Sequence, residues 1–316
     1  MIQSPSDAPL RHPGAPGVGG MWPTAARAGG ASSRGRAALG LVLMASGAGL
    51  LLLTASWYVA PWPDRSAHKD VARRLPIAAP PPEVAGLRSI EDLANAVLRE
   101  GPAPPRELAR RASALVDARF DTCHGSAFTF QQNWIAAAMG LVEPTYGLHT
   151  SAHAIRYADC SLCGEVNGTL VRVLGRLGVP ARLFVVPGHV LAEVEWDGSW
   201  HVVDPHYGYF PEARFAPDAA ALAGDPRLVD AVYRGRIPPD VLALTLHAFA
   251  DFRADDPATG PRPVQRDNAP NVATAHQVAE VAKWILPALA IAVGSLLRRR
   301  ARRADAGALS QGAPRA

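Results

Sequence analysis

Residues 163–182 read CGEVNGTLVRVLGRLGVPAR, and residues 183–205 continue as LFVVPGHVLAEVEWDGSWHVVDP. In the first stretch, apolar residues recur at helical spacing from Cys163 to Leu177, which predicts a helix that begins at the cysteine. Gly178-Val-Pro180 ends this pattern, because proline cannot continue a helix and glycine is common just after one.

The second stretch changes from helical spacing to alternation, which predicts strands. Asp197-Gly198, between two alternating runs, is a strong signal for a tight antiparallel hairpin. We expect strands over residues 182–186, 190–196 and 200–203. A helix followed by an antiparallel hairpin indicates an α+β domain, since an α/β domain would alternate helices with parallel strands.

Three residues suited to nucleophilic chemistry lie at the ends of these elements. Cys163 opens the helix, where the positive end of the backbone dipole favours a thiolate. An imidazole can take the thiol proton and return it to a leaving group, and a carboxylate fixes the imidazole tautomer. His189 and Asp204 flank the hairpin turn, so pairing of the strands would bring them close. The three residues can act together if the hairpin packs against the start of the helix.

These segments resemble the transglutaminase-like superfamily, in particular a bacterial membrane-anchored branch. The resemblance covers residues from about 160 to 210, with the cysteine helix, the Gly-Val-Pro-Ala-Arg segment, the histidine strand and the Val-Asp-Pro strand end in the family's order. It implies a papain-like core in which a cysteine-bearing helix packs on an antiparallel sheet. It also implies roles for three residues, with Cys163 as the nucleophile, His189 as the general base and Asp204 as the orienting carboxylate.

The sequence departs from the crosslinking members of that superfamily on both sides of the cysteine. Leu162 precedes Cys163 where those enzymes carry glutamine, and Gly164 follows it where they carry tryptophan. The oxyanion donors therefore have to come from elsewhere. The backbone N–H of Cys163 and a side chain of the segment Gln131-Gln-Asn133 are the candidates.

The chain has three cysteines, so at least one thiol stays unpaired within it. A disulfide between Cys123 and Cys160 would leave Cys163 free, whereas a disulfide between Cys160 and Cys163 would silence the nucleophile. The spacing Cys160-x-x-Cys163 also fits a thiol–disulfide redox pair. With a histidine it fits a zinc site, for which the candidates are His189, His201 and His206.

An apolar segment over residues 37–60 precedes this region. It carries no charge and exceeds the roughly 20 residues that a helix needs to cross a bilayer core. Trp57, Tyr58 and Trp62 lie at its far end, where aromatic rings settle at the level of the lipid headgroups. We expect a transmembrane helix, with a secretory signal peptide as the alternative.

A second apolar segment follows, over residues 278–297. To reach spanning length it must include Glu280 and Lys283, so an interfacial helix is the alternative to a second span. Arginines flank both segments on the side away from the central region: Arg34 and Arg36 lie just before the first segment, and a cluster of five arginines (residues 298–303) lies just after the second. The positive-inside rule therefore predicts cytoplasmic termini and an extracytoplasmic central domain.

We divide the chain as follows: a disordered cytoplasmic arm (1–36), a transmembrane helix (37–60), a Pro-rich linker (61–86), a transglutaminase-like domain (87–260), a linker (261–277), a second transmembrane helix (278–297) and a basic cytoplasmic tail (298–316). Further helices are expected from a cap at Ser89 and over residues 106–120, 133–143, 225–234 and 240–252. The true start of translation, Met1 or Met21, stays open.

We expect a multi-pass protein of the bacterial inner membrane that performs acyl transfer or amide hydrolysis through a thioester on Cys163. The expected partners are a peptide or protein substrate in the cell envelope and the lipid bilayer. The net charge is +4, but the sequence has no basic stripe interleaved with aromatic residues, which argues against nucleic-acid binding. The chemistry needs no metal or organic cofactor. Two alternatives are an inactive scaffold of a cell-envelope system and a zinc-binding module, and the oligomeric state stays open.

Overall fold

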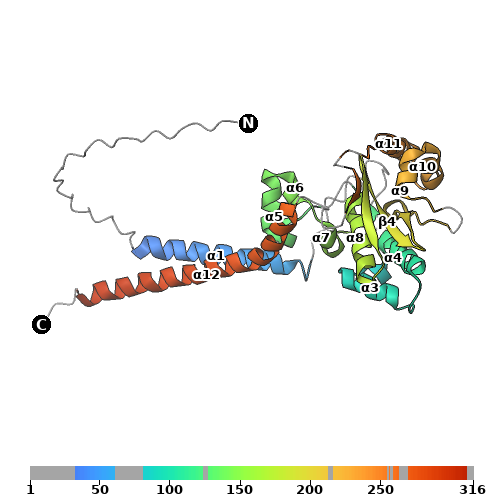
Figure 1. The fold of residues 1–316 in the computed structure, drawn as a ribbon. Coiled ribbons are helices and arrows are strands. Elements are labelled where there is room, and N and C mark those ends of the chain that lie inside the picture. The colour runs from blue at the N-terminus through green and yellow to red at the C-terminus, as the bar shows by residue number, and fades with distance from the viewer. Residues whose placement is uncertain are drawn as a thin grey trace, which may run out of the picture.

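The computed structural model describes residues 33–60, 81–123, 127–212, 216–254, 256, 259–262 and 270–311. It combines a long pair of helices with a domain of helices around an antiparallel sheet (Figure 1). The expected α+β class is confirmed. Nearly all of the expected arm, most of the Pro-rich linker, Trp62 and the last five residues lie outside the described residues.

The sheet of the domain has four antiparallel strands in the order β5-β4-β3-β6. Three of them match the predicted strands: β3 (Ala181–Val186), β4 (His189–Trp196) and β5 (Ser199–Val203). Asp197 and Gly198 both have positive φ angles, 54° and 74°, as the tight hairpin between β4 and β5 requires. The edge strand β6 (Gly260–Arg262) was not predicted, because three residues with Gly and Pro show no alternation.

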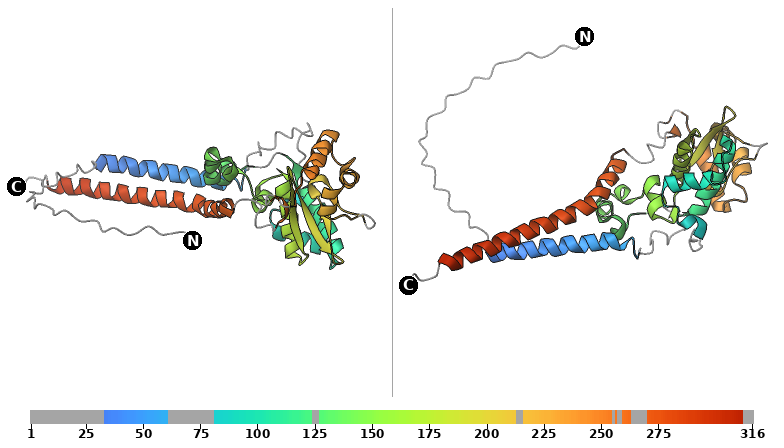
Figure 2. Two further views of the ribbon diagram at one scale, coloured as in Figure 1. Left: turned by 45° about the horizontal axis from the view of Figure 1, so that its top comes forward. Right: turned by 90° about the horizontal axis from the view of Figure 1, so that it is seen from below.

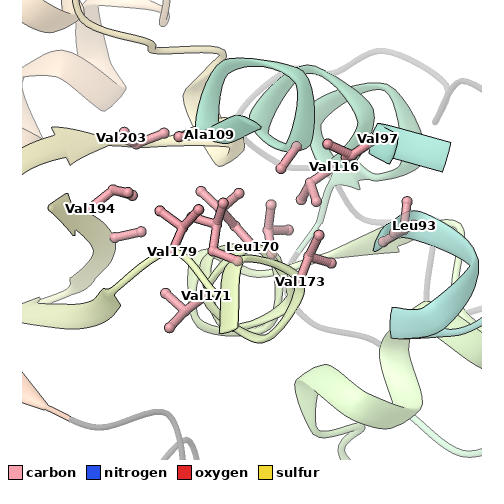
Figure 3. Close-up of a cluster of buried hydrophobic side chains, with 14 of the residues drawn as sticks. Leu93, Val97, Ala109, Val116, Leu170, Val171, Val173, Val179, Val194 and Val203 are labelled. Atoms are coloured by element: carbon pink, nitrogen blue, oxygen red, sulfur yellow. The ribbon is translucent and has the colours of Figure 1, made fainter. Parts of the chain in front are cut away.

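One face of the sheet packs on the predicted cysteine helix, α8 (Cys163–Arg176). This helix is central because α3 (Ile90–Leu98) and α4 (Pro105–Arg119) pack on its other sides. Ser89 caps α3 as expected, accepting a hydrogen bond from Asp92 N at 3.0 Å. Figure 3 shows how the helices and strands meet in a hydrophobic core, with Leu93, Val97, Ala109, Val116, Leu170, Val171, Val173, Val179, Val194 and Val203 labelled.

The opposite face of the sheet is covered by three helices from the C-terminal part of the domain: α9 (Ala219–Gly224), α10 (Pro226–Tyr233) and α11 (Pro239–Ala250). Strand residues alternate between the two cores, so Leu183 faces α8 and Phe184 faces the second set of helices. Both faces of the sheet are therefore buried, and the functional side chains lie at its edge and ends. Shorter elements complete the domain: α2 (Pro82–Ala85), β1 (Asp121–Thr122), β2 (Cys160–Ser161) and the 3-10 turn η2 (Pro205–Tyr207).

The helix pair consists of α1 (Ser33–Ser56) and α12 (Pro270–Gln311), which run side by side in opposite directions in both views of Figure 2. Both are long enough and apolar enough to cross a membrane. Glycines let them approach closely, since a Cβ added at Gly40 would collide with the backbone oxygen of Gly294. α12 is longer than the helix expected over 278–297, because its first two turns continue to the domain and its basic end stays helical.

Three helices join the helix pair to the domain: α5 (Phe130–Val142), α6 (Pro144–Gly147) and α7 (Ser151–Tyr157). α5 is broken at Asn133, whose φ of −157° and ψ of 97° are not helical. The Asn133 side-chain oxygen accepts from Ala136 N at 3.1 Å, which frees the carbonyl of Gln132. That carbonyl accepts from Lys283 Nζ of α12 at 2.9 Å.

A second helix break at the junction is used in the same way. Pro287 has no N–H and so frees the carbonyl of Lys283 four residues earlier, which accepts from Trp134 Nε1 at 3.4 Å. The two charged residues of the second apolar segment form an ion pair, with Lys283 Nζ 2.9 Å from Glu280 Oε2. Glu280 also accepts from Asn133 and from the Tyr157 hydroxyl. The joining helices α5 and α7 therefore supply the partners that these two charged residues need next to an apolar segment.

Candidate active site

Cys163 lies at the first residue of α8 and is half-buried. The start of the helix is held by Glu165, whose carboxylate accepts from Leu162 N at 3.1 Å. The other two cysteines, Cys123 and Cys160, form a disulfide that leaves Cys163 with a free thiol. Of the two disulfides considered from the sequence, the structure has the one that leaves the Cys163 thiol free.

His189 and Asp204 lie close together at the end of the sheet, as expected from the pairing of the hairpin strands. His189 begins β4 and Asp204 directly follows β5, and the antiparallel register brings these two strand ends together. His189 Nε2 lies 2.8 Å from Asp204 Oδ2, and both side chains are buried. Cys163 lines the same cleft as this imidazole, and its side chain contributes to the raised pKa of His189. Since Nε2 is bound to Asp204, Nδ1 is the nitrogen left for the thiol proton.

Two further side chains hold the Asp204 carboxylate. Asn167 Nδ2, one turn after Cys163 on α8, donates to Asp204 Oδ1 at 3.0 Å and lies 3.1 Å from the Cys163 backbone oxygen. The Tyr233 hydroxyl of α10 donates to Asp204 Oδ2 at 3.0 Å. Both residues are fully buried. Neither residue was predicted as part of the site. Asn167 lies in the stretch that carries the family resemblance, but no role was assigned to it, and Tyr233 lies far along the chain.

The electrostatics of the buried pair favour its charged form. Burial alone would lower the pKa of His189, but the charge and hydrogen bond of Asp204 outweigh it and raise the pKa. Burial alone would raise the pKa of Asp204, but His189 outweighs it, and the pKa of that carboxyl is lowered. The arrangement therefore stabilises an imidazolium, the species that a thiol creates when it gives its proton to His189.

The thiol and the imidazole open into a cleft of about 440 Å³. This volume lies within the range of small-molecule sites, roughly 300–1,000 Å³. Tyr207 covers the imidazole, with the two rings stacked at 4.9 Å between centroids. His206, a candidate zinc ligand from the sequence, lines the cleft beside His189 at 6.0 Å between ring centroids. One wall comes from α11, whose place beside the cysteine was not predicted.

The other sequence candidates are placed elsewhere. The predicted oxyanion side chains Gln131, Gln132 and Asn133 do not line the cleft, and their amides are bound at the junction, to Ala60 O, Tyr157 O and Glu280. Only the backbone N–H of Cys163 remains from that prediction.

The zinc and redox hypotheses both need Cys160 beside Cys163, but Cys160 is bonded to Cys123. His201, the third histidine considered, binds the Ala216 backbone oxygen at 2.9 Å. Within the described part of the chain, no group of three or more His, Cys, Asp or Glu is arranged to hold a metal ion.

Comparison with known proteins gives little to add to this geometry. No family model matches the chain, and no curated protein matches it. One solved structure that matches is described as "Crystal structure of a TGase", at 15% sequence identity and a TM-score of 0.28. The match covers 46% of this chain and 47% of the TGase chain, so this chain spans about half the length of that solved structure. Because this similarity does not assign the fold, we base the functional proposal on the site.

Proposed function

We propose that the protein is a membrane-anchored cysteine acyltransferase or amidase of transglutaminase-like architecture. Cys163 is the nucleophile, His189 the general base and Asp204 the residue that orients the imidazole. The observation that carries the proposal is the buried His189–Asp204 pair at 2.8 Å beside a free thiol that opens a helix. A purely structural pair would not need a free cysteine and a cleft next to it.

In the proposed reaction, the Cys163 proton moves to His189 Nδ1 and the thiolate attacks the carbonyl carbon of an amide. The C–S bond forms, the C–N bond breaks, and His189 returns the proton to the leaving amine. Water or a second amine then attacks the thioester and releases Cys163. Asp204 stays ionised throughout and stabilises the imidazolium. The Cys163 backbone N–H, at the start of α8, is the candidate donor to the developing oxyanion.

The same proposal includes membrane anchoring by α1 and α12, with the domain outside the cytoplasm. The support comes from two helices of spanning length, from arginines at their far ends and from the Cys123–Cys160 disulfide. Disulfides persist in oxidising compartments and are rare in the cytosol. A substrate in the cell envelope, as a peptide or a protein side chain, follows from this placement.

The proposal is tested by trapping the acyl-enzyme. The full-length protein in detergent is mixed with p-nitrophenyl acetate, and the acetyl adduct is mapped by mass spectrometry with and without an added amine. We expect an adduct on Cys163 that turns over to water or to the amine, and a rate lower by orders of magnitude in His189→Ala. Equal rates in both proteins would instead favour the inactive scaffold.

A further inference from the structure

One wall of the cleft is a continuous apolar helix face. Val241, Leu244, Thr245 and Ala248 of α11 line it, at positions i, i+3, i+4 and i+7 of the helix. Residues at this spacing share one side of a helix. The Thr245 hydroxyl donates to the Val241 backbone oxygen at 2.9 Å, so its hydrogen is used within the helix. The wall therefore presents mainly methyl and methylene groups to the space beside Cys163.

One edge of this wall is exposed although it is apolar. Leu244 keeps 69% of its surface accessible, while Thr245 and Ala248 of the same wall keep 3% and 7%. No described part of the chain covers Leu244. A ligand that covers this side chain removes apolar surface from water, which is favourable.

The charged residues around the cleft also favour an uncharged ligand. None of the described residues that line it is Lys or Arg. Among the described lining residues the one carboxylate is that of Asp251, which is paired with His247 on the exposed rim, with Nε2 and Oδ2 3.1 Å apart. Recognition of a carboxylate or phosphate commonly uses Arg or Lys forks, and none of the described residues that line the cleft supplies one.

We propose that the α11 face is a substrate subsite for an uncharged, apolar substituent next to the reactive carbonyl, with Leu244 as its specificity-determining residue. The subsite rests on the proposed function, because it uses Cys163 as the reacting group. It narrows the substrates to amides whose substituent next to the carbonyl is aliphatic or aromatic, and it disfavours acidic substituents.

The test uses two electrophiles that differ only in this substituent: N-benzyl chloroacetamide and N-carboxymethyl chloroacetamide. The alkylation rate of Cys163 in the full-length protein is measured for each reagent. It is then divided by the rate at which the same reagent alkylates free glutathione. We expect a preference of about tenfold or more for the benzyl reagent, from the apolar surface that it buries on α11. Leu244→Lys should remove or reverse this preference. Leu98→Lys, at a leucine of α3 that is 48% exposed and outside the cleft, should keep it.

Normalised rates that agree within about twofold, or a preference for the carboxylate, would overturn the subsite. An unchanged preference in Leu244→Lys would overturn the role of Leu244. This ratio is independent of how reactive the thiol is, because both reagents alkylate the same sulfur. Failure of the subsite is therefore distinguishable from failure of the catalytic proposal, which is measured by the acetyl adduct and by its loss in His189→Ala.

Discussion

The Tyr233 hydroxyl donates a hydrogen bond to Asp204 Oδ2 at 3.0 Å, and that oxygen also binds His189 Nε2 at 2.8 Å. Tyr233 belongs to α10, far along the chain from the segment that carries the site. The helices on the second face of the sheet therefore hold the site together as well as cover the core. Asn167 holds the other carboxylate oxygen from the opposite side.

Tyr233→Phe should lower the free energy of unfolding by about 1.5–3 kcal/mol, since a buried hydrogen bond to a charged group is lost. It should also slow acetylation of Cys163, because Asp204 is held less firmly. Tyr209→Phe is the matched control. Its buried hydroxyl has no hydrogen-bond partner among the described residues, so its removal should cost little. Thermal unfolding in detergent measures the stability loss of each variant. Equal losses in Tyr233→Phe and Tyr209→Phe would contradict the role of Tyr233.

The pKa shifts of the buried pair predict how its stabilising effect depends on pH. The lowered pKa of Asp204 gives stability above the unfolded value of about 3.9, which is lost as the pH falls. The raised pKa of His189 gives stability below the unfolded value of about 6.5, which is lost as the pH rises toward the folded value. The difference in melting temperature between the wild type and the His189→Gln/Asp204→Asn variant should therefore peak between about pH 4 and 6.5. A difference that does not change with pH would refute the charged pair.

The disulfide should be found between Cys123 and Cys160 when the protein is digested under non-reducing conditions, with Cys163 alkylated. The bond closes a separation of 37 residues, so its reduction should lower stability by about 4 kcal/mol. It should also loosen the segment that leads into Cys163. A peptide that links Cys160 to Cys163 would show instead that the thiol is held in an inactive disulfide.

Lys283→Met should destabilise the joint between the helix pair and the domain by about 3–5 kcal/mol, because Glu280 loses its ammonium partner. The double variant Glu280→Gln/Lys283→Met should recover much of this loss, since neither charge is then left alone. Melting temperatures in the same detergent give the comparison. If the double variant were as unstable as Lys283→Met, loss of the ion pair would not explain the destabilisation.

The elements predicted best are those whose side chains repeat with a period. The cysteine helix and the three strands after Pro180 match the structure to within one or two residues, because both elements bury regular faces. The hairpin turn also followed from two residues, Asp197 and Gly198. The neighbourhood of His189 and Asp204 could therefore be predicted from strand pairing alone.

What could not be predicted depends on single polar residues that act across the fold. Asn133 was predicted as the start of a helix, but α5 begins at Phe130, and Asn133 breaks it and frees a carbonyl for Lys283. Asn167 and Tyr233 converge on Asp204 only after two cores have formed on opposite sides of the sheet. α11 was predicted as a helix, but its place beside Cys163 depends on the segment after β5, which has no regular pattern.

The most direct test of the central claim is the rate of iodoacetamide alkylation at Cys163 as a function of pH, in the full-length protein and in His189→Ala. An assembled thiol–imidazole pair predicts rapid labelling well below pH 8, and slower labelling in His189→Ala. An ordinary thiol profile centred near 8.5, the same in both proteins, would contradict an activated nucleophile at this site.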